Sequence, residues 1–168
     1  MNPILNPLTA MHRTVFALIF LVASCGNVIA EEIATPTERV RSAISDIMNV
    51  LKNENLDRDQ KWSEVGRVVD AGFDFRSMSQ SILATNWRTA TTEEKRQFVE
   101  YFAQYLEATY RDKIEAYTNQ RVEYMNESVR GDRAVVDTII MTDATQIPVT
   151  YKLKLNDEGW FAYDVVIE

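Results

Sequence analysis

The sequence lacks most of the side chains on which catalysis and metal binding usually depend. It has one histidine, His12, and one cysteine, Cys25, and both lie within the first 30 residues. The rest of the chain therefore cannot form a disulfide, a Ser–His–Asp triad, a cysteine nucleophile or a zinc site of imidazole and thiolate ligands. Glycine is also scarce, with five residues, and none belongs to a phosphate-binding loop. These absences exclude most familiar enzyme classes.

Basic residues are fewer than acidic ones, 18 against 25, which gives a net charge of −7. Proteins that bind nucleic acids neutralise phosphates with clustered cations, so we expect no nucleic-acid partner. The length of 168 residues fits one domain with one hydrophobic core.

The first 30 residues have the pattern of a secretion signal. His12 and Arg13 form a short positive region, residues 14–23 form an apolar stretch, and residues 28–30 resemble a cleavage site. The apolar stretch is shorter than the roughly 20 residues that span a bilayer. The sequence therefore predicts a signal peptide over 1–30 and one exported domain over 31–168. Residues 22–25 also resemble a lipoprotein box, which leaves open a second cut with lipidation of Cys25 and a tethered domain.

The first half of the exported region has helical patterns. Thr35 to Glu38 form a capping box with a proline in the first turn, and apolar residues then recur at helical spacing up to Leu51. A second helix is predicted from near Asp57 to Gly72, and a short third helix follows a cap at Asp74. Residues 91–94 form another capping box before a long amphipathic helix with this apolar stripe: Phe98, Phe102, Tyr105, Leu106, Thr109 and Tyr110.

The second half changes to a period of two after Asn119. The pattern predicts four strands, Arg121–Glu127, Arg133–Thr142, Gln146–Leu155 and Trp160–Ile167. Residues 131–132 and 156–159 have turn chemistry, and such short connections favour an antiparallel meander. The predicted fold class is α+β, with an N-terminal helical layer packed on the apolar face of a four-stranded antiparallel sheet.

Two carboxylates give the strongest case for an enzyme. Asp137 lies between Val135 and Ile139, and Asp164 is expected on one register with Ala162 and Val166. A core-facing carboxylate would have a raised pKa and become a general base, with Tyr151 or Tyr163 as its partner. A solvent-facing carboxylate would have no such role, and the period of two cannot choose between the faces.

The other acidic groups do not suggest a metal site. Residues 156–158 and the pair Asp57 and Asp59 are too short for a calcium loop, and turn and cap roles explain them. We therefore expect no metal, no cofactor and no catalysis. The composition points to a binding protein without naming its ligand.

The order of several short motifs resembles the MlaC-type (toluene-tolerance) family of periplasmic phospholipid-binding proteins. The resemblance spans most of residues 36–168. It rests on Phe73–Met78, Ile82–Leu83, Asn86–Thr91, Glu94–Phe98, Phe102, Tyr105–Leu106, Thr109–Tyr110, Gly131–Val135, Ile147–Val149, Gly159–Trp160 and Tyr163–Glu168.

This resemblance implies a periplasmic carrier that moves phospholipids between an outer-membrane lipoprotein complex and an inner-membrane ABC transporter complex. It also implies a cavity between the sheet and the helices that holds the acyl chains, and it supplies no catalytic residue. Each buried CH₂ group contributes about 0.8 kcal/mol, so an apolar cavity holds acyl chains without charge pairing.

The expected contacts with the acyl chains are apolar residues of the long helix and the inner strands. They are Phe98, Phe102, Leu106, Val136, Ile140, Val149 and Tyr151. Leu83 and Trp87 are expected at the mouth of the cavity. Each of these residues has an alternative role in the ordinary core.

Similar proteins continue beyond the position of Glu168 with a glycine, a short connection and a further helix. The sequence therefore leaves two expectations open, a C-terminally truncated domain or a cavity that is closed in another way. A third class of function also stays open, an envelope adaptor that binds proteins through its acidic surface.

Overall fold

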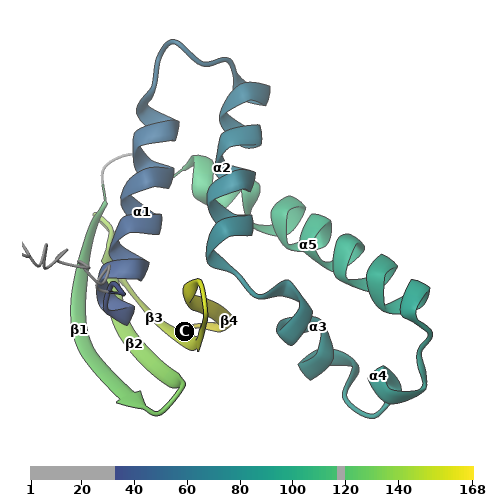
Figure 1. The fold of residues 1–168 in the computed structure, drawn as a ribbon. Helices are drawn as coiled ribbons and strands as arrows, with labels where there is room; N and C mark the ends of the chain where they lie inside the picture. The colour runs from purple at the N-terminus through teal and green to yellow at the C-terminus, as the bar shows by residue number, and fades with distance from the viewer. Residues whose placement is uncertain (1–32, 117–119) are drawn as a thin grey trace, which may run out of the picture. The chain divides into compact units, whose positions relative to one another are not determined.

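The computed structural model describes residues 33–116 and 120–168, in which a helical half precedes a sheet (Figure 1). The helices are α1 (Pro36–Lys52), α2 (Arg58–Gly72), α3 (Phe75–Leu83), α4 (Asn86–Thr89) and α5 (Thr92–Glu115). The strands are β1 (Arg121–Arg130), β2 (Arg133–Met141), β3 (Gln146–Asn156) and β4 (Gly159–Ile167). The predicted α+β class is confirmed. The sequence did not predict the single turn α4, and β1 continues past its predicted end at Glu127.

The helices begin where side chains satisfy the free amides of the first turn. The Thr35 hydroxyl accepts a hydrogen bond from the Glu38 amide at 3.2 Å, and the Glu38 carboxylate accepts one from the Thr35 amide at 2.7 Å. Thr91 and Glu94 make the same pair of bonds at 3.2 and 2.7 Å. A reciprocal cap at Asp57 starts α2. Both predicted capping boxes are therefore confirmed.

The sheet is an antiparallel meander in the order β1-β2-β3-β4, so each strand pairs with the next along the chain. The turn between β1 and β2 contains Gly131 at φ 61°, and the turn between β3 and β4 contains Gly159 at φ 122°. Residues with a Cβ rarely adopt these conformations, which explains glycine at both turns. Bulges at Met125 in β1 and at Tyr163 in β4 shift the register locally.

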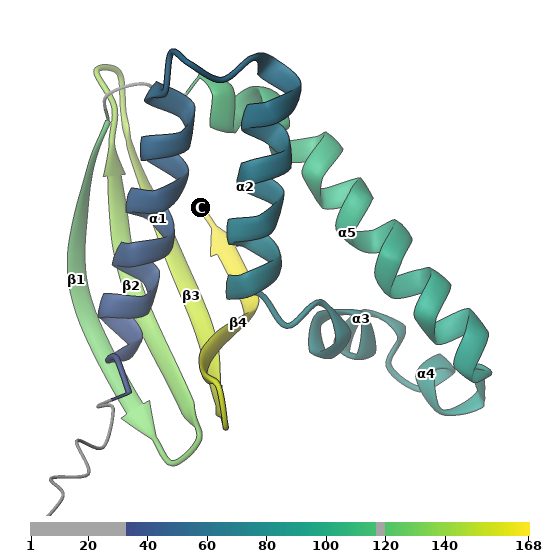
Figure 2. The ribbon, with the colours of Figure 1, turned by 45° about the horizontal axis from the view of Figure 1, so that its top comes forward.

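The core lies on the inner face of the sheet, which α1 and α2 cover (Figure 2). Its central cluster joins Val40 of α1 to residues of three strands, Ala134, Val136, Leu153 and Trp160. Val136 is completely buried. The buried hydroxyl of Thr138 donates a 3.1 Å hydrogen bond to the carbonyl of Val149, so this polar group is satisfied.

Contacts between residues distant in the sequence hold the helices to the sheet. The Arg39 guanidinium donates hydrogen bonds to the carbonyls of Trp160, at 3.3 Å, and Ala71. The chain between α2 and α3 lies beside β4, where the Asp74 amide donates to the carbonyl of Ala162 at 2.8 Å. These bonds connect α1, α2 and the last strand in one unit.

The outer face of the sheet carries polar side chains. Lys152 and Lys154 lie on this face, and Val149 and Leu153 of the same strand are buried on the other. The predicted alternation along this strand is therefore confirmed.

Candidate functional site

The predicted acyl-chain contacts on α5 lie on a helix that buries none of its side chains. Phe98, Phe102 and Leu106 follow one another at intervals of four residues and are all half-buried. The rings of Phe98 and Phe102 stack, with centroids 6.1 Å apart and planes at 15°. Tyr101 and Tyr105 are each 65% exposed. The apolar stripe on α5 therefore stays partly accessible.

The two residues expected at the cavity mouth occupy different environments. Leu83 ends α3 and is half-buried, whereas Trp87 of α4 is buried, with 8% of its surface exposed. The Arg76 guanidinium and the Lys95 ammonium lie 5.3 and 5.6 Å from the centroid of the Trp87 ring. Trp87 therefore connects α3, α4 and the start of α5.

The four predicted residues of the sheet all lie on its inner face. Val136 and Val149 are buried, Tyr151 packs against the central cluster, and Ile140 is half-buried near the end of β2. Protein atoms enclose Val136 in this structure. The predicted contacts of these residues with acyl chains stay predictions.

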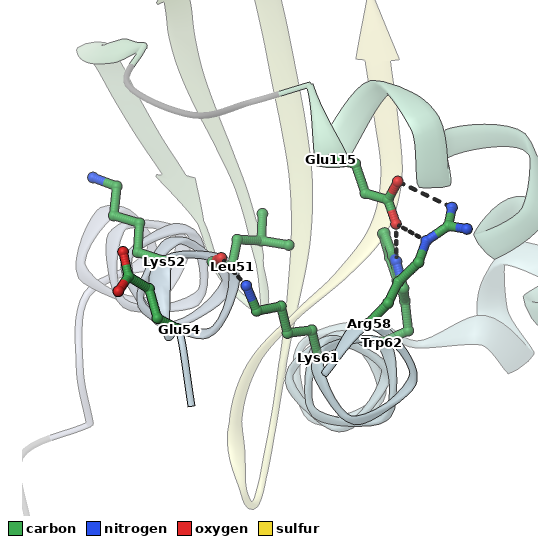
Figure 3. Close-up of a pocket in the computed structure, with 7 residues that line it drawn as sticks. All are labelled: Leu51, Lys52, Glu54, Arg58, Lys61, Trp62 and Glu115. Carbon is green, nitrogen blue, oxygen red and sulfur yellow. Dashed lines mark hydrogen bonds and ion pairs between the residues drawn. The ribbon is translucent and has the colours of Figure 1, made fainter. Parts of the chain in front are cut away.

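A hollow of about 610 Å³ lies where the ends of α1, α2 and α5 meet (Figure 3). Its lining residues are Leu51, Lys52, Glu54, Arg58, Lys61, Trp62 and Glu115. The volume falls within the roughly 300–1,000 Å³ of small-molecule sites. The wall combines apolar Leu51 and Trp62 with charges of both signs, which suits an amphipathic molecule.

One carboxylate organises the α5 side of this hollow. Glu115 accepts hydrogen bonds from Arg58 Nε at 2.8 Å and Nη2 at 3.1 Å, and a further bond from the indole N–H of Trp62 (Figure 3). The bonds from Arg58, and then that from Trp62, lower the pKa of Glu115, and the same ion pair raises the pKa of Arg58. Across the hollow, the Lys61 ammonium donates to the carbonyl of Leu51 at 2.8 Å.

A second hollow of about 460 Å³ lies between α2 and α5. Its lining is mostly polar and comprises Asp59, Trp62, Ser63, Gly66, Arg67, Asp70, Glu107 and Arg111. None of the nine predicted site residues lines either hollow. The sequence reasoning missed Arg58, Lys61 and Glu115 because no local pattern shows that residues 57 positions apart form a pair.

The condition for the enzyme hypothesis is not met by either carboxylate. Asp137 accepts a hydrogen bond from the Thr150 hydroxyl at 2.7 Å, and Asp164 accepts one from the Lys152 ammonium at 2.6 Å. Both lie on the outer face, and the ion pair with Asp164 raises the pKa of Lys152. The expectation that Asp164 shares a register with Ala162 was wrong, because the bulge at Tyr163 moves the two side chains to opposite faces.

Within residues 33–116 and 120–168, no cluster of three histidine, cysteine or acidic side chains is arranged to bind a metal ion. Among the same residues, no helix has the length and hydropathy of a transmembrane span. The predicted signal peptide and Cys25 lie outside the described residues.

Comparisons with known proteins give a family and a fold. A family model described as MlaC protein matches residues 41–168. A solved structure of the phospholipid-binding protein from Ralstonia solanacearum, in complex with a phospholipid, matches with a TM-score of 0.71 and 24% identity. That match covers 80% of this chain and 79% of the other.

An NTF-2 like protein of unknown function from Silicibacter pomeroyi DSS-3 matches with a TM-score of 0.43 and 11% identity, over 80% of this chain and 98% of its own. No curated protein matches the chain.

Proposed function

The chain belongs to the MlaC family, and from this premise we propose that it binds phospholipids and carries them through the periplasm. The main support for this proposal is the family match over residues 41–168. The fold shared with the Ralstonia solanacearum protein, which is in complex with a phospholipid, supports it further.

The partial exposure of the apolar side chains of α5 supports a role in holding acyl chains. A helix that packs on a core normally buries its apolar stripe, but α5 buries no side chain. Phe98, Phe102 and Leu106 are therefore apolar groups that the described fold covers only in part. Acyl chains laid along this stripe would remove the remaining apolar surface from water, at about 25 cal/mol per Å².

A carrier needs no reaction, which agrees with the chemistry of the described residues. Asp137 and Asp164 form polar contacts on the outer face and leave the inner face without the proposed Asp/Tyr pair. Binding and release of a lipid require only that its chains exchange one apolar environment for another. We therefore propose a carrier and not an enzyme.

The proposed route runs between an outer-membrane lipoprotein complex and an inner-membrane lipid ABC transporter complex. It requires export, which the pattern of residues 1–30 favours. A free carrier would lose these residues, whereas lipidation of Cys25 would produce a tethered protein that acts locally.

Mass spectrometry of the purified full-length product tests the proposal. Native spectra should show a complex, and denaturing spectra of the same sample should show a released two-chain phospholipid. If the protein emerges without lipid, it is incubated with phospholipid vesicles and measured again. Protein that remains free of lipid after this incubation would overturn the proposal.

A matched pair of variants tests where the chains lie. Phe102→Ser on α5 should reduce the lipid-bound fraction, whereas Val129→Ser should leave it unchanged. Val129 is an exposed apolar side chain of β1, away from α5, so it controls for the general effect of replacing an accessible apolar group by serine. Equal lipid loading of both variants would contradict the placement on α5.

A further inference from the structure

We propose that the corner around α4 docks this protein on an anionic lipid surface. The α4 corner comprises the three cations Arg76, Arg88 and Lys95 and the exposed Ile82 of α3, and two of these cations, Arg76 and Lys95, lie over the buried ring of Trp87. In both views of the fold, α4 lies beyond α3 and away from the sheet (Figures 1 and 2). This docking step goes beyond the proposed function and does not depend on it.

The charge at this corner differs from that of the rest of the chain. Residues 75–92 contain no aspartate or glutamate, although the whole sequence has 25 acidic residues. Arg76 and Arg88 lie in this stretch, and Lys95 follows in the first turn of α5. In the described part of the chain, no ion pair joins any of the three to a carboxylate. Their charges are therefore available to an external anion.

The two carboxylates that precede Lys95 in the sequence have hydrogen-bond partners within the first turns of α5. Glu93 accepts hydrogen bonds from Arg96 at 2.6 and 3.0 Å. Glu94 is held by the amide and hydroxyl of Thr91 in the capping box of α5. Neither carboxylate forms an ion pair with the three cations, although after the bonds from Thr91 the charge of Lys95 also contributes to lowering the pKa of Glu94.

Trp87 fixes the position of two of the three cations. The Arg76 guanidinium and the Lys95 ammonium lie within 5.3 and 5.6 Å of its ring centroid, close enough for cation–π attraction. Arg88 follows Trp87 directly and is exposed. Two of the cations thus lie over one buried ring, and the third belongs to the next residue of α4.

An exposed apolar side chain accompanies these charges. Ile82, near the end of α3, has 55% of its surface exposed. Ala84 then takes a positive φ of 48°, which ends the helix immediately after Leu83. Exposed apolar groups and cations on the same part of a protein are the combination that binds at the interface of anionic membranes. Because the chain has a net charge of −7, an anionic membrane would repel most of the protein surface. The protein would therefore bind with the α4 corner facing the membrane.

Cosedimentation of the full chain with vesicles tests this proposal. One vesicle population contains phosphatidylcholine alone, and the other contains phosphatidylcholine with phosphatidylglycerol. The triple variant Arg76→Gln/Arg88→Gln/Lys95→Gln should bind the anionic vesicles about a hundredfold more weakly than wild type, because each basic residue contributes about fivefold. Ile82→Ser should weaken binding by about tenfold.

The control removes the same charge from the sheet, in the triple variant Arg121→Gln/Arg130→Gln/Lys154→Gln. It should stay within about twofold of wild type on the anionic vesicles. All variants share residues 1–32, so any membrane affinity of that segment cancels in the comparison. Within residues 33–116 and 120–168 the Arg88 side chain forms no hydrogen bond, ion pair or ring contact. The single variant Arg88→Gln should therefore fold normally and alone lower binding about fivefold, which controls for misfolding of the triple variant.

Equal losses in the two triple variants would overturn the proposal, because binding would then follow net charge alone. Equal binding of wild type to neutral and anionic vesicles would also overturn it. Normal vesicle binding by the corner variant, with loss of binding to a protein partner, would assign the corner to that partner instead. Phospholipid loading, measured on the soluble fraction, reports separately on the proposed carrier function.

Discussion

Replacing Leu106 of α5 by alanine should weaken phospholipid binding and leave the fold nearly as stable as before. The same change at Leu153 of β3 should destabilise the fold and leave phospholipid binding by the folded protein nearly unchanged. The two substitutions remove identical atoms from different surroundings. Leu106 is half-buried on a helix without a buried side chain, whereas Leu153 is 1% exposed in the central cluster.

The expected magnitudes follow from these environments. Leu153→Ala leaves a cavity in the cluster and should lower the free energy of unfolding by about 3–5 kcal/mol. At about 3–4 °C per kcal/mol for a domain of this size, the melting temperature should fall by roughly 10–20 °C. Leu106→Ala should cost less than about 1.5 kcal/mol, because part of the side chain is already in contact with water. Loss of its contact with an acyl chain should raise the Kd for phospholipid by roughly fivefold to thirtyfold.

Urea unfolding of the lipid-free protein gives the stabilities, and transfer of a fluorescent phospholipid from vesicles gives the relative affinities. Lipid binding by Leu153→Ala is measured well below its unfolding midpoint, so that the comparison concerns folded protein. A large loss of stability in Leu106→Ala would show that α5 supports the core. Unchanged lipid transfer in that variant would refute the placement of acyl chains along α5.

Three further outcomes test the structure itself. Thr138→Val removes the buried hydrogen bond to Val149 and should lower the free energy of unfolding by about 0.5–1.5 kcal/mol in urea titration. Gly131→Ala forces a Cβ into φ 61° and should cost about 1–2 kcal/mol, measured in the same way. Hydrogen bonding from Arg96 lowers the pKa of Glu93 from 4.5 to about 2. The contribution of ionised Glu93 to the stability of the fold should therefore be present above pH 4.5 and disappear as the pH falls through 2. NMR titration should show the midpoint of Glu93 shifting upward in Arg96→Gln.

Much of the fold could be predicted because local rules act within a few residues. Thr35 with Glu38 and Thr91 with Glu94 mark the starts of α1 and α5 in the sequence, and the structure places both caps there. Alternation along β3 likewise identifies Leu153 as inward-facing. In these cases the residues that form the structural feature lie within a few positions of one another in the sequence. The local sequence pattern is therefore enough to predict the feature.

The parts that could not be predicted depend on longer-range geometry. The period of two could not assign a face to Asp164, and an extra residue at Tyr163 then reversed its relation to Ala162. The pairing of Arg58 with Glu115 joins the start of one helix to the end of another, and neither residue belongs to a motif. Only the folded chain shows that these two residues line one hollow.

The candidate site falls between these two cases. The spacing of Phe98, Phe102 and Leu106 correctly identifies an apolar stripe, but spacing does not identify what covers it. The same pattern would serve a core helix or a lipid contact. Among the sheet residues, inward orientation was predictable, whereas the complete enclosure of Val136 depends on its packing with Val40 of α1.

The bonds from Arg39 to the carbonyls of Ala71 and Trp160 have a consequence for the order of folding. During synthesis α1 is made early, but one of its two anchoring carbonyls belongs to β4, the last strand. Each hairpin of the sheet pairs strands that are consecutive in the chain, so it can form as soon as both strands are made. The bond from Arg39 of α1 to Trp160 instead joins residues 121 positions apart. The packing of α1 on α2 and the bond to Ala71 can form early, whereas the cover that α1 gives the sheet is complete only when β4 is available. We therefore expect the closure of α1 onto β4 to be a late step of folding, and pulsed hydrogen exchange should show the amides of β4 gaining protection no earlier than those of the two preceding hairpin strands.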